Sequence, residues 1–374
     1  MSNKLRRVAV IGTGSFLPGE PIPNSRIDEI LGPLTEAPAN VQSFIKNVGT
    51  RMLGSSGVEY RHFAIDPQTH RLTHSVASLA EEAARRALDL AGMKPDDVDL
   101  LLLSSPNYDQ STPPTSTLLQ ERLGIETCAE MEIHSNCSGV GKCMQIAFDA
   151  LRLGRYRTAL VTYAQLSSVY LRSCYFNQPR MTKTQAALRY ILADGSGAVL
   201  LQAVDDDKPI RHELLGTYVE SVGGTREAGM TAGGGVGDLM DADGQIPGVF
   251  ERGSHHLDQD FTAVSRDAGR LLFEGVVQMV KSLGLDPSKI DAIVPSIPSR
   301  QLYEDNVGRF TEYFKISRDQ VKFRARDTGY CGGTSLLLHF DEMVRSDEMR
   351  PGQILLVHSV ESSKWMSAGF AVRW

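Results

Sequence analysis

Residues 135–164 read SNCSGVGKCMQIAFDALRLGRYRTALVTYA, and this stretch decides the fold. A cysteine lies among small residues on a turn, and an amphipathic helical pattern containing Phe-Asp follows it. A basic turn then leads into an apolar run of strand length. Residues 329–359, GYCGGTSLLLHFDEMVRSDEMRPGQILLVHS, follow the same plan about 194 residues later. The two copies predict an internal repeat of an α/β unit.

The segments that precede these two copies also repeat. Residues 75–93 have a helical pattern that runs into KPDDVDLLLLSSP, and residues 266–298 repeat helix, glycine, turn and strand at a similar offset. This alternation predicts an α/β fold with duplicated halves at 1–205 and 206–374, packed as one compact unit. A Gly-rich stretch within 222–262 interrupts the second half, and we expect it to form a lid or an excursion from the sheet.

The composition excludes several classes of protein. The 374 residues are 41% hydrophobic and 22% charged, and a net charge of −6 without a Lys/Arg run argues against a nucleic-acid partner. The apolar runs are too short to cross a membrane, and the N-terminus lacks a secretory signal. Five unevenly spaced cysteines favour reduced thiols in the cytoplasm. We expect no metal, nucleotide or flavin cofactor, and we expect the His255-His256 pair to lie in an exposed polar loop.

Cys137 is the candidate nucleophile, because it lies where a strand becomes a helix. The positive end of the helix dipole and unpaired backbone amides favour a thiolate there. Gly139 and Gly141 allow the backbone to approach a thioester carbonyl, and the amide of Cys137 is a possible oxyanion donor. The alternative is a small buried apolar residue, as free cysteines often are. We favour that alternative for the other cysteines of the first half, Cys128, Cys143 and Cys174.

The order of motifs resembles the thiolase fold, and within it the β-ketoacyl-acyl-carrier-protein synthase III type of ketosynthase. Besides the cysteine helix, the segments that carry the resemblance are VAVIGTGSFLP, GVEYRHFA, STPPTSTLLQERLG, LADGSGAVLL and GGTSLLLHFDEM. The resemblance implies a layered αβαβα arrangement with mostly parallel mixed sheets. It also implies that Cys137 accepts an acyl group from acyl-CoA or an acyl carrier protein, and that the chain forms a homodimer.

The chain departs from the family pattern at two catalytic positions. The family's Val-Pro-His segment matches IVPSIPSRQL, so Ser296 stands in place of the histidine. The family's Gly-Asn-Thr-Ser matches GGTS, so Gly333 stands in place of the asparagine. In the family these two side chains donate hydrogen bonds to the thioester oxygen during malonyl decarboxylation, and the loss of one such donor costs about 3–4 kcal/mol. The family's Gly-Gly-Gly segment is also altered, which leaves Gly369 as the candidate for the second oxyanion amide, beside that of Cys137.

Several other side chains are candidates to support the nucleophile. His134 lies three residues before Cys137, but strand alternation turns it away, which favours a supporting role over that of a general base. Ser296 retains a hydroxyl donor, and Cys331 is a candidate polar neighbour. Near the C-terminus, the side chains that are candidates to project into the site are His358, Glu361 and Lys364.

These observations predict a ketosynthase III-like acyltransferase. The enzyme loads an acyl group on Cys137 and passes it to an acceptor that is already nucleophilic: an amine, a hydroxyl, an activated carbon or a carrier thiol. Such a site fits a specialised biosynthetic pathway. Two alternatives remain open: a decarboxylating Claisen-condensing enzyme with a relocated base, and a catalytically silent subunit that pairs with an active ketosynthase.

Overall fold

The computed structural model describes residues 5–205, 208–241, 245–346 and 348–374, and its centre is a mixed sheet with the strand order β11-β12-β13-β8-β1-β7-β6-β4-β5. The strands of the first half are β1 (Arg7–Phe16), β4 (Leu100–Ser105), β5 (Ala129–His134), β6 (Thr158–Leu166) and β7 (Asp194–Val204). Those of the second half are β8 (Glu213–Ser221), β11 (Ala292–Pro295), β12 (Ile354–Glu361) and β13 (Met366–Arg373). The β1–β8 ladder, which pairs Ala9 with Glu213, joins the two halves.

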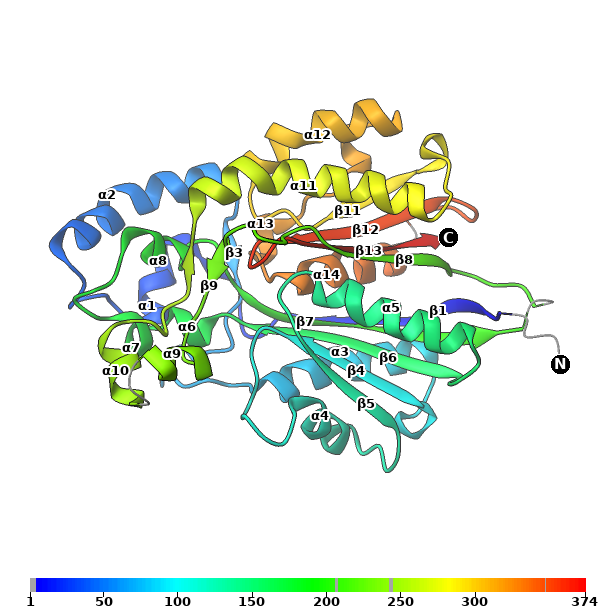
Figure 1. Ribbon diagram of the computed structural model, residues 1–374, viewed down its shortest axis with the longest axis horizontal. Helices are drawn as coiled ribbons and strands as arrows, with labels where there is room; N and C mark the ends of the chain where they lie inside the picture. Colours follow the sequence, from blue (N-terminus) through cyan, green and yellow to red (C-terminus); the bar gives the residue numbers. More distant parts are fainter. Residues whose placement is uncertain (1–4, 206–207, 242–244, 347) are drawn as a thin grey trace.

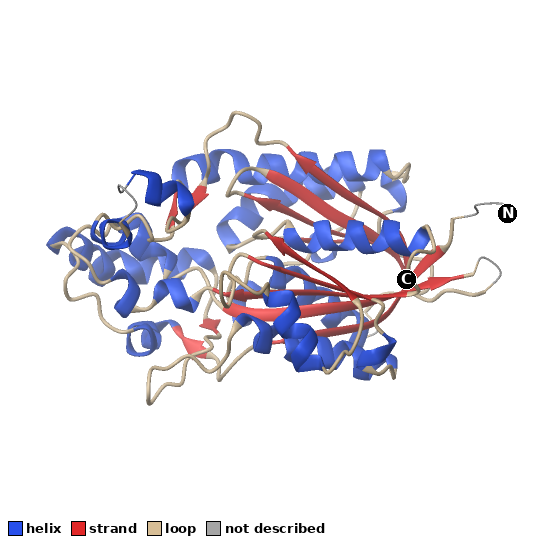
Figure 2. Cartoon of the chain, turned by 60° about the horizontal axis from the view of Figure 1, so that its bottom comes forward, coloured by secondary structure: helices blue, strands red, loops and turns tan. Residues whose placement is uncertain are grey.

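Helices cover both faces of each half, so that five layers form (Figure 1). The outer helices of the first half are α3 (Val76–Ala91) and α4 (Thr115–Leu123), and those of the second half are α11 (Phe261–Ser282) and α12 (Arg300–Phe314). The middle layer contains α5 (Gly139–Arg152) and α14 (Gly333–Arg345). Figure 2 shows the strands in two layers with helices between and outside them. The predicted thiolase-type αβαβα arrangement is confirmed.

The middle layer follows directly from the repeat in the sequence. Helices α5 and α14 begin at Gly139 and Gly333, at the offset between the two copies. Their apolar faces pack together with both half-sheets in one core, which includes Val140, Met144 and Phe340. The division into halves at 1–205 and 206–374 stays a prediction.

The expectation of mostly parallel strands is wrong. The parallel pairs are β4–β5, β4–β6 and β11–β12, whereas the antiparallel pairs are β1–β7, β1–β8, β6–β7, β8–β13 and β12–β13. The reason is that the last strand of each half, β7 or β13, runs antiparallel to both of its neighbours in the sheet. A turn at residues 362–365 joins β12 to β13 without a crossover helix, and helix–strand alternation in the sequence does not reveal that return.

A lobe of short elements lies beyond the strand ends, at the left in Figure 1. Segment 222–262 contributes β9 (Met230–Thr231), α9 (Val236–Asp241), α10 (Ile246–Glu251) and β10 (Asp258–Gln259). Further elements are β2 (Ile22–Pro23), α1 (Ile27–Leu31), α2 (Ala39–Ser56), β3 (Tyr60–Arg61), α6 (Ser168–Leu171), α7 (Ser173–Phe176), α8 (Lys183–Leu188) and α13 (Ala325–Thr328). No helix within the described ranges is long and apolar enough to cross a membrane.

The expectation of an exposed loop at His255 and His256 is wrong. These two residues are only 2% and 3% exposed. Both rings lie edge-on against aromatic side chains of α7, with His255 on Tyr175 and His256 on Phe176. Local polarity suggested a surface loop, but the aromatic residues that bury the pair are about 80 positions away in the sequence.

Candidate active site

A cavity of about 1090 Å³ opens where the carboxyl ends of the strands meet the lobe. Residues at the carboxyl ends of four parallel strands line the cavity: Asn107 after β4, Ser135 after β5, Gln165 in β6 and Ser296 after β11. Such strand ends are the usual ligand site of parallel α/β sheets. Segment 222–262 closes part of the cavity through Met230, Phe250 and their neighbours, which include Gly233, Gly234, Gly235 and Gln259.

Cys137 lines this cavity, on the turn between β5 and α5. It is half-buried and precedes Ser138, the N-cap of α5. Its carbonyl oxygen accepts a 2.9 Å hydrogen bond from the hydroxyl of Ser359, in β12 of the other half. Both halves of the molecule therefore hold the turn that presents the thiol.

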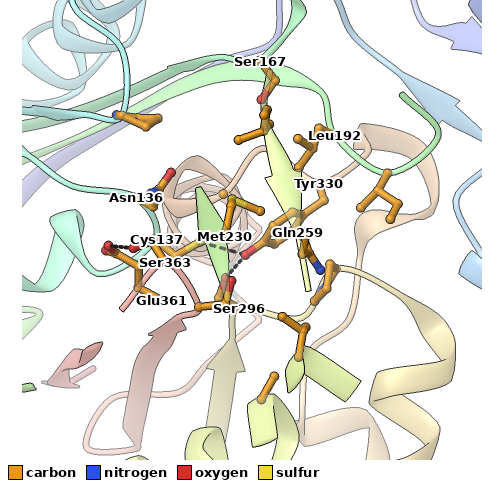
Figure 3. Close-up of a pocket in the computed structure, with 18 of the residues that line it drawn as sticks. Asn136, Cys137, Ser167, Leu192, Met230, Gln259, Ser296, Tyr330, Glu361 and Ser363 are labelled. Carbon is orange, nitrogen blue, oxygen red and sulfur yellow. Dashed lines mark hydrogen bonds between the residues drawn. The ribbon is translucent and has the colours of Figure 1, made fainter. Parts of the chain in front are cut away.

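Tyr330 is the nearest polar partner of the thiol (Figure 3). Its phenol oxygen lies 2.9 Å from the Cys137 Sγ and 2.9 Å from the Ser296 Oγ. The backbone of Tyr330 is fixed beside residues 191–193, because the Ala193 amide donates to its carbonyl at 3.0 Å. Three side chains from three distant segments thus form a row of one thiol and two hydroxyls.

The space at the position of the family's asparagine is filled differently here. A Cβ atom added at Gly333 would lie 2.8 Å from the Tyr163 ring, so that ring occupies the place of a side chain. Gly332 has a φ of +55°, and a Cβ there would lie 1.9 Å from the Gln165 side-chain oxygen. Gln165 in turn accepts a hydrogen bond from the Tyr163 hydroxyl at 3.2 Å. The site carries phenols where the resemblance leads one to expect an amide and an imidazole.

The surroundings of Cys137 keep its sulfur protonated, contrary to the expected thiolate. Burial raises the pKa of the thiol to about 11, and the Glu361 charge adds to that rise. Hydrogen bonds from Tyr330 and Ser296 to the sulfur oppose this shift without cancelling it. Because Cys137 lies ahead of the helix N-cap, the helix dipole does not outweigh the loss of solvent.

Glu361 is a buried carboxylate at the start of α5. Its Oε2 accepts hydrogen bonds from the Ser135 Oγ at 2.7 Å, the Ser138 Oγ at 2.5 Å and the Ser138 amide at 3.3 Å. Lys142 donates to the Ser135 Oγ at 2.8 Å, and Ser363 donates to the other carboxylate oxygen. Burial favours a higher pKa for Glu361, but these hydrogen bonds and the Lys142 charge lower it overall. A carboxylate therefore occupies the helix end that would otherwise stabilise a thiolate.

The structure brings some of the other expected residues to the cavity. His134 lines it from the exposed end of β5, with its ring 6.4 Å from that of Tyr108. Ser296 and Glu361 line it as well. Ser296 is buried, and its amide donates to the His358 carbonyl at 2.9 Å.

The remaining expected residues lie elsewhere. Cys331 is fully buried, and its thiol donates to the Asp194 carbonyl at 3.3 Å, outside the cavity lining. Gly369 lies within β13, opposite His358 of β12 and Tyr218 of β8, so its amide is in the sheet and does not reach the cavity. Residues 362–363, on the turn between β12 and β13, line the cavity instead.

Two further candidates also point away from the site. His358 is fully buried, pairs through Nε2 with the Ser367 hydroxyl at 3.0 Å, and has a pKa lowered to about 3 by burial. Lys364 donates to the Arg226 carbonyl. Among the residues that the structure describes, no group of three or more His, Cys, Asp or Glu side chains could hold a metal ion.

Sequence reasoning missed Tyr330. Its signal was present in the quoted GYCGGTS, directly before Cys331. A hydroxyl-bearing aromatic residue next to the altered Gly333, in a chain that also lacks the family's histidine, is a compensation that could have been considered.

Comparison with known proteins identifies the family. The model for 3-oxoacyl-[acyl-carrier-protein (ACP)] synthase III matches residues 131–219. The β-ketoacyl-[acyl-carrier-protein] synthase III of Neisseria meningitidis is 26% identical over 354 residues, which cover 94% of each chain. The chain is a thiolase-fold, ketosynthase III-like protein.

Two solved structures share the fold of this chain. AbyA1, a tetronic acid condensing enzyme, has a TM-score of 0.76 and 25% identity, covering 98% of this chain and 100% of its own. The 3-oxoacyl-(acyl carrier protein) synthase III of Xanthomonas oryzae has a TM-score of 0.76 and 18% identity, covering 99% and 100%. The divergence from the family pattern at Ser296 and Gly333 stays a prediction.

Proposed function

We propose that this ketosynthase III-like enzyme is an acyltransferase that works through an acyl thioester on Cys137. The donor is an acyl-CoA or an acyl carrier protein, and the acceptor, in a specialised biosynthetic pathway, arrives already nucleophilic. One observation carries the proposal: a half-buried thiol faces a large cavity, while Ser296 and Gly333 occupy the positions of the histidine and asparagine.

The geometry supports the first half of this reaction. The Cys137 sulfur attacks the thioester carbonyl, a new C–S bond forms, and the donor leaves as its thiol. Cys137 and residues 362–363 line the same cavity, so their backbone amides are candidates to stabilise the oxyanion.

The altered positions argue against decarboxylation as the source of the nucleophile. Without the family's imidazole and amide donors, a malonyl enolate loses about 3–4 kcal/mol of stabilisation for each missing hydrogen bond. An acceptor that needs no decarboxylation avoids this loss. This is why we propose transfer to an amine, a hydroxyl, an activated carbon or a carrier thiol.

A condensing enzyme is the second candidate, and one contact favours it. The hydroxyls of Tyr330 and Ser296 lie beside the nucleophile, where they could donate to a thioester oxygen. The similar AbyA1 is named as a condensing enzyme. Decarboxylation of a malonyl thioester by the purified protein would favour this candidate over acyl transfer.

The proposal includes a homodimer and a reducing, cytoplasmic setting. Strand β5, which leads to Cys137, is the edge of the sheet, and edge strands commonly pair with a second chain. All five cysteines are free, and the mechanism needs Cys137 to remain so.

The proposed function is tested by intact-protein mass after mixing with a panel of acyl-CoA and acyl-carrier thioesters. We expect an acyl adduct on the wild type and on Cys174→Ala, which removes an exposed thiol, but none on Cys137→Ala. If no donor leaves an adduct on the wild type, the acyltransferase is excluded and the catalytically silent subunit is favoured.

A further inference from the structure

We infer that Tyr330 and Ser296 form a hydroxyl relay that carries the proton of the Cys137 thiol, in place of a histidine base. The same relay returns a proton to the sulfur when the acceptor takes the acyl group. This inference rests on the proposed function, because it describes how the proton moves during acyl transfer at Cys137.

The contacts meet the geometric needs of a relay. A phenol can accept one hydrogen bond and donate another, and the Tyr330 oxygen has a partner at 2.9 Å on each side. The row therefore runs from the thiol through the phenol to the Ser296 hydroxyl, or in the reverse direction. The two hydroxyl-bearing residues are anchored, since backbone hydrogen bonds fix Tyr330 beside Ala193 and Ser296 beside His358.

The nearby charged group is already engaged. The Glu361 carboxylate accepts hydrogen bonds from three serines, and none of its contacts reaches the Cys137 sulfur. The described side chains in hydrogen-bond contact with the Cys137 sulfur thus belong to this hydroxyl row.

Acylation balances through the relay without an external base. As the sulfur attacks the thioester carbon, the thiol proton passes to the Tyr330 oxygen and the phenol proton passes to the Ser296 oxygen. Ser296 gives its own proton to the departing donor thiolate. The C–S bond to the donor breaks and the C–S bond to Cys137 forms. Cys137 ends acylated, while the Tyr330 and Ser296 hydroxyls and the donor thiol end neutral.

Transfer to the acceptor runs the relay backwards. The acceptor attacks the acyl carbon, the Cys137 sulfur leaves, and the acceptor's proton returns to that sulfur through Ser296 and Tyr330.

The first arm of the test measures the single-turnover rate of adduct formation from acetyl-CoA and hexanoyl-CoA. We expect Tyr330→Phe to slow acylation by about 10²-fold, the size of a typical proton-transfer contribution. Ser296→Ala should also slow it, and the double variant should be no slower than Tyr330→Phe, because the two groups act as a unit. The matched control is Tyr313→Phe, a partly exposed ring on α12 outside the cavity.

A solvent isotope effect separates a relay from a structural role. The acylation rate of the wild type should fall in heavy water, and Tyr330→Phe should lose that dependence. If Tyr330→Phe acylates as fast as the wild type, the relay is excluded while the proposed acyltransferase stands. If neither these two donors nor any thioester of the panel acylates the wild type, the acyltransferase and the relay on it both fail.

The second arm tests the return of the proton on the isolated acyl-enzyme. We expect N-acetylcysteamine to discharge the adduct of the wild type faster than that of Tyr330→Phe, with Tyr313→Phe matching the wild type. Equal discharge rates for the wild type and Tyr330→Phe would overturn this second step of the relay.

Discussion

At Cys137, two opposing influences set the reactivity of the sulfur. Burial and the Glu361 charge favour the neutral thiol, whereas hydrogen bonds from Tyr330 and Ser296 favour the thiolate. Burial and the Glu361 charge have the larger effect, so the resting enzyme holds a neutral thiol that becomes reactive only as its proton leaves. This balance protects the nucleophile from adventitious alkylation in the absence of an acyl donor.

We predict that Glu361→Gln makes Cys137 more reactive. The amide keeps an oxygen that accepts from Ser135 and Ser138 but removes the negative charge that raises the thiol pKa. The iodoacetamide alkylation rate should rise with pH toward about 11 in the wild type, and the variant's profile should lie up to about one pH unit lower. A Cys174→Ala background removes the exposed thiol, and an unshifted profile would show that Glu361 does not act on the sulfur.

On the scale of elements, one buried carboxylate ties α14 to β1. Asp341 accepts hydrogen bonds from the Thr13 and Ser15 hydroxyls, each at 2.7 Å, and from the Arg345 Nε at 2.9 Å. It is only 4% exposed, so its removal would leave the hydroxyls of Thr13 and Ser15 without this hydrogen-bond acceptor. The tie fixes the helix that begins at Gly333, shortly after Tyr330.

We predict that Asp341→Ala lowers the free energy of unfolding by about 2–4 kcal/mol, because buried polar groups lose their partner. Urea unfolding followed by circular dichroism measures this. Asp149→Ala is the matched control, since Asp149 belongs to the corresponding Phe-Asp of α5 but is exposed. Equal effects of the two substitutions would contradict a special role for the Asp341 tie.

Segment 222–262 should loosen in mild acid. Burial lowers the pKa of His256 to about 4, so the folded state binds fewer protons than the unfolded state below the usual histidine pKa of about 6.5. The stability of this segment therefore falls as the pH drops from about 6.5 toward 4. Its amide hydrogens should exchange faster at pH 5 than at pH 7.5 after correction for intrinsic rates, while α3 remains unchanged. His256→Phe should remove the difference.

The elements were predicted well where periodicity alone defines them. Helices α3 and α5 each bury a stripe of apolar residues, whereas α14, in the middle layer, is buried on all sides from Gly333 to Asp341. Strand direction and the burial of His255-His256 were not predictable in this way. Both depend on contacts between segments far apart in the chain, such as α7 with segment 222–262.

The whole molecule explains why the site was only partly predicted. The duplication alone placed Cys137 and the 329–359 copy on facing helices of the middle layer. Which residue of GYCGGTS faces the thiol depends on how the loop pairs with residues 191–193, and local sequence does not encode that pairing. The side chain of Tyr330 therefore contacts the thiol, whereas the side chain of Cys331 is buried in the core.

Assembly is the last consequence of this architecture. Strand β5 ends the sheet with an open edge, carries the exposed Met131, and leads within three residues of its end to Cys137. We predict a homodimer that pairs these edges, and Met131→Pro should dissociate it by removing a backbone donor. Sedimentation velocity at micromolar concentration measures the state, with Leu153→Lys as a control at an exposed apolar residue elsewhere. Because a freed β5 no longer holds the nucleophile turn, the dissociated variant should also acylate Cys137 more slowly. A wild type that sediments as a monomer would instead show that the edge is not used.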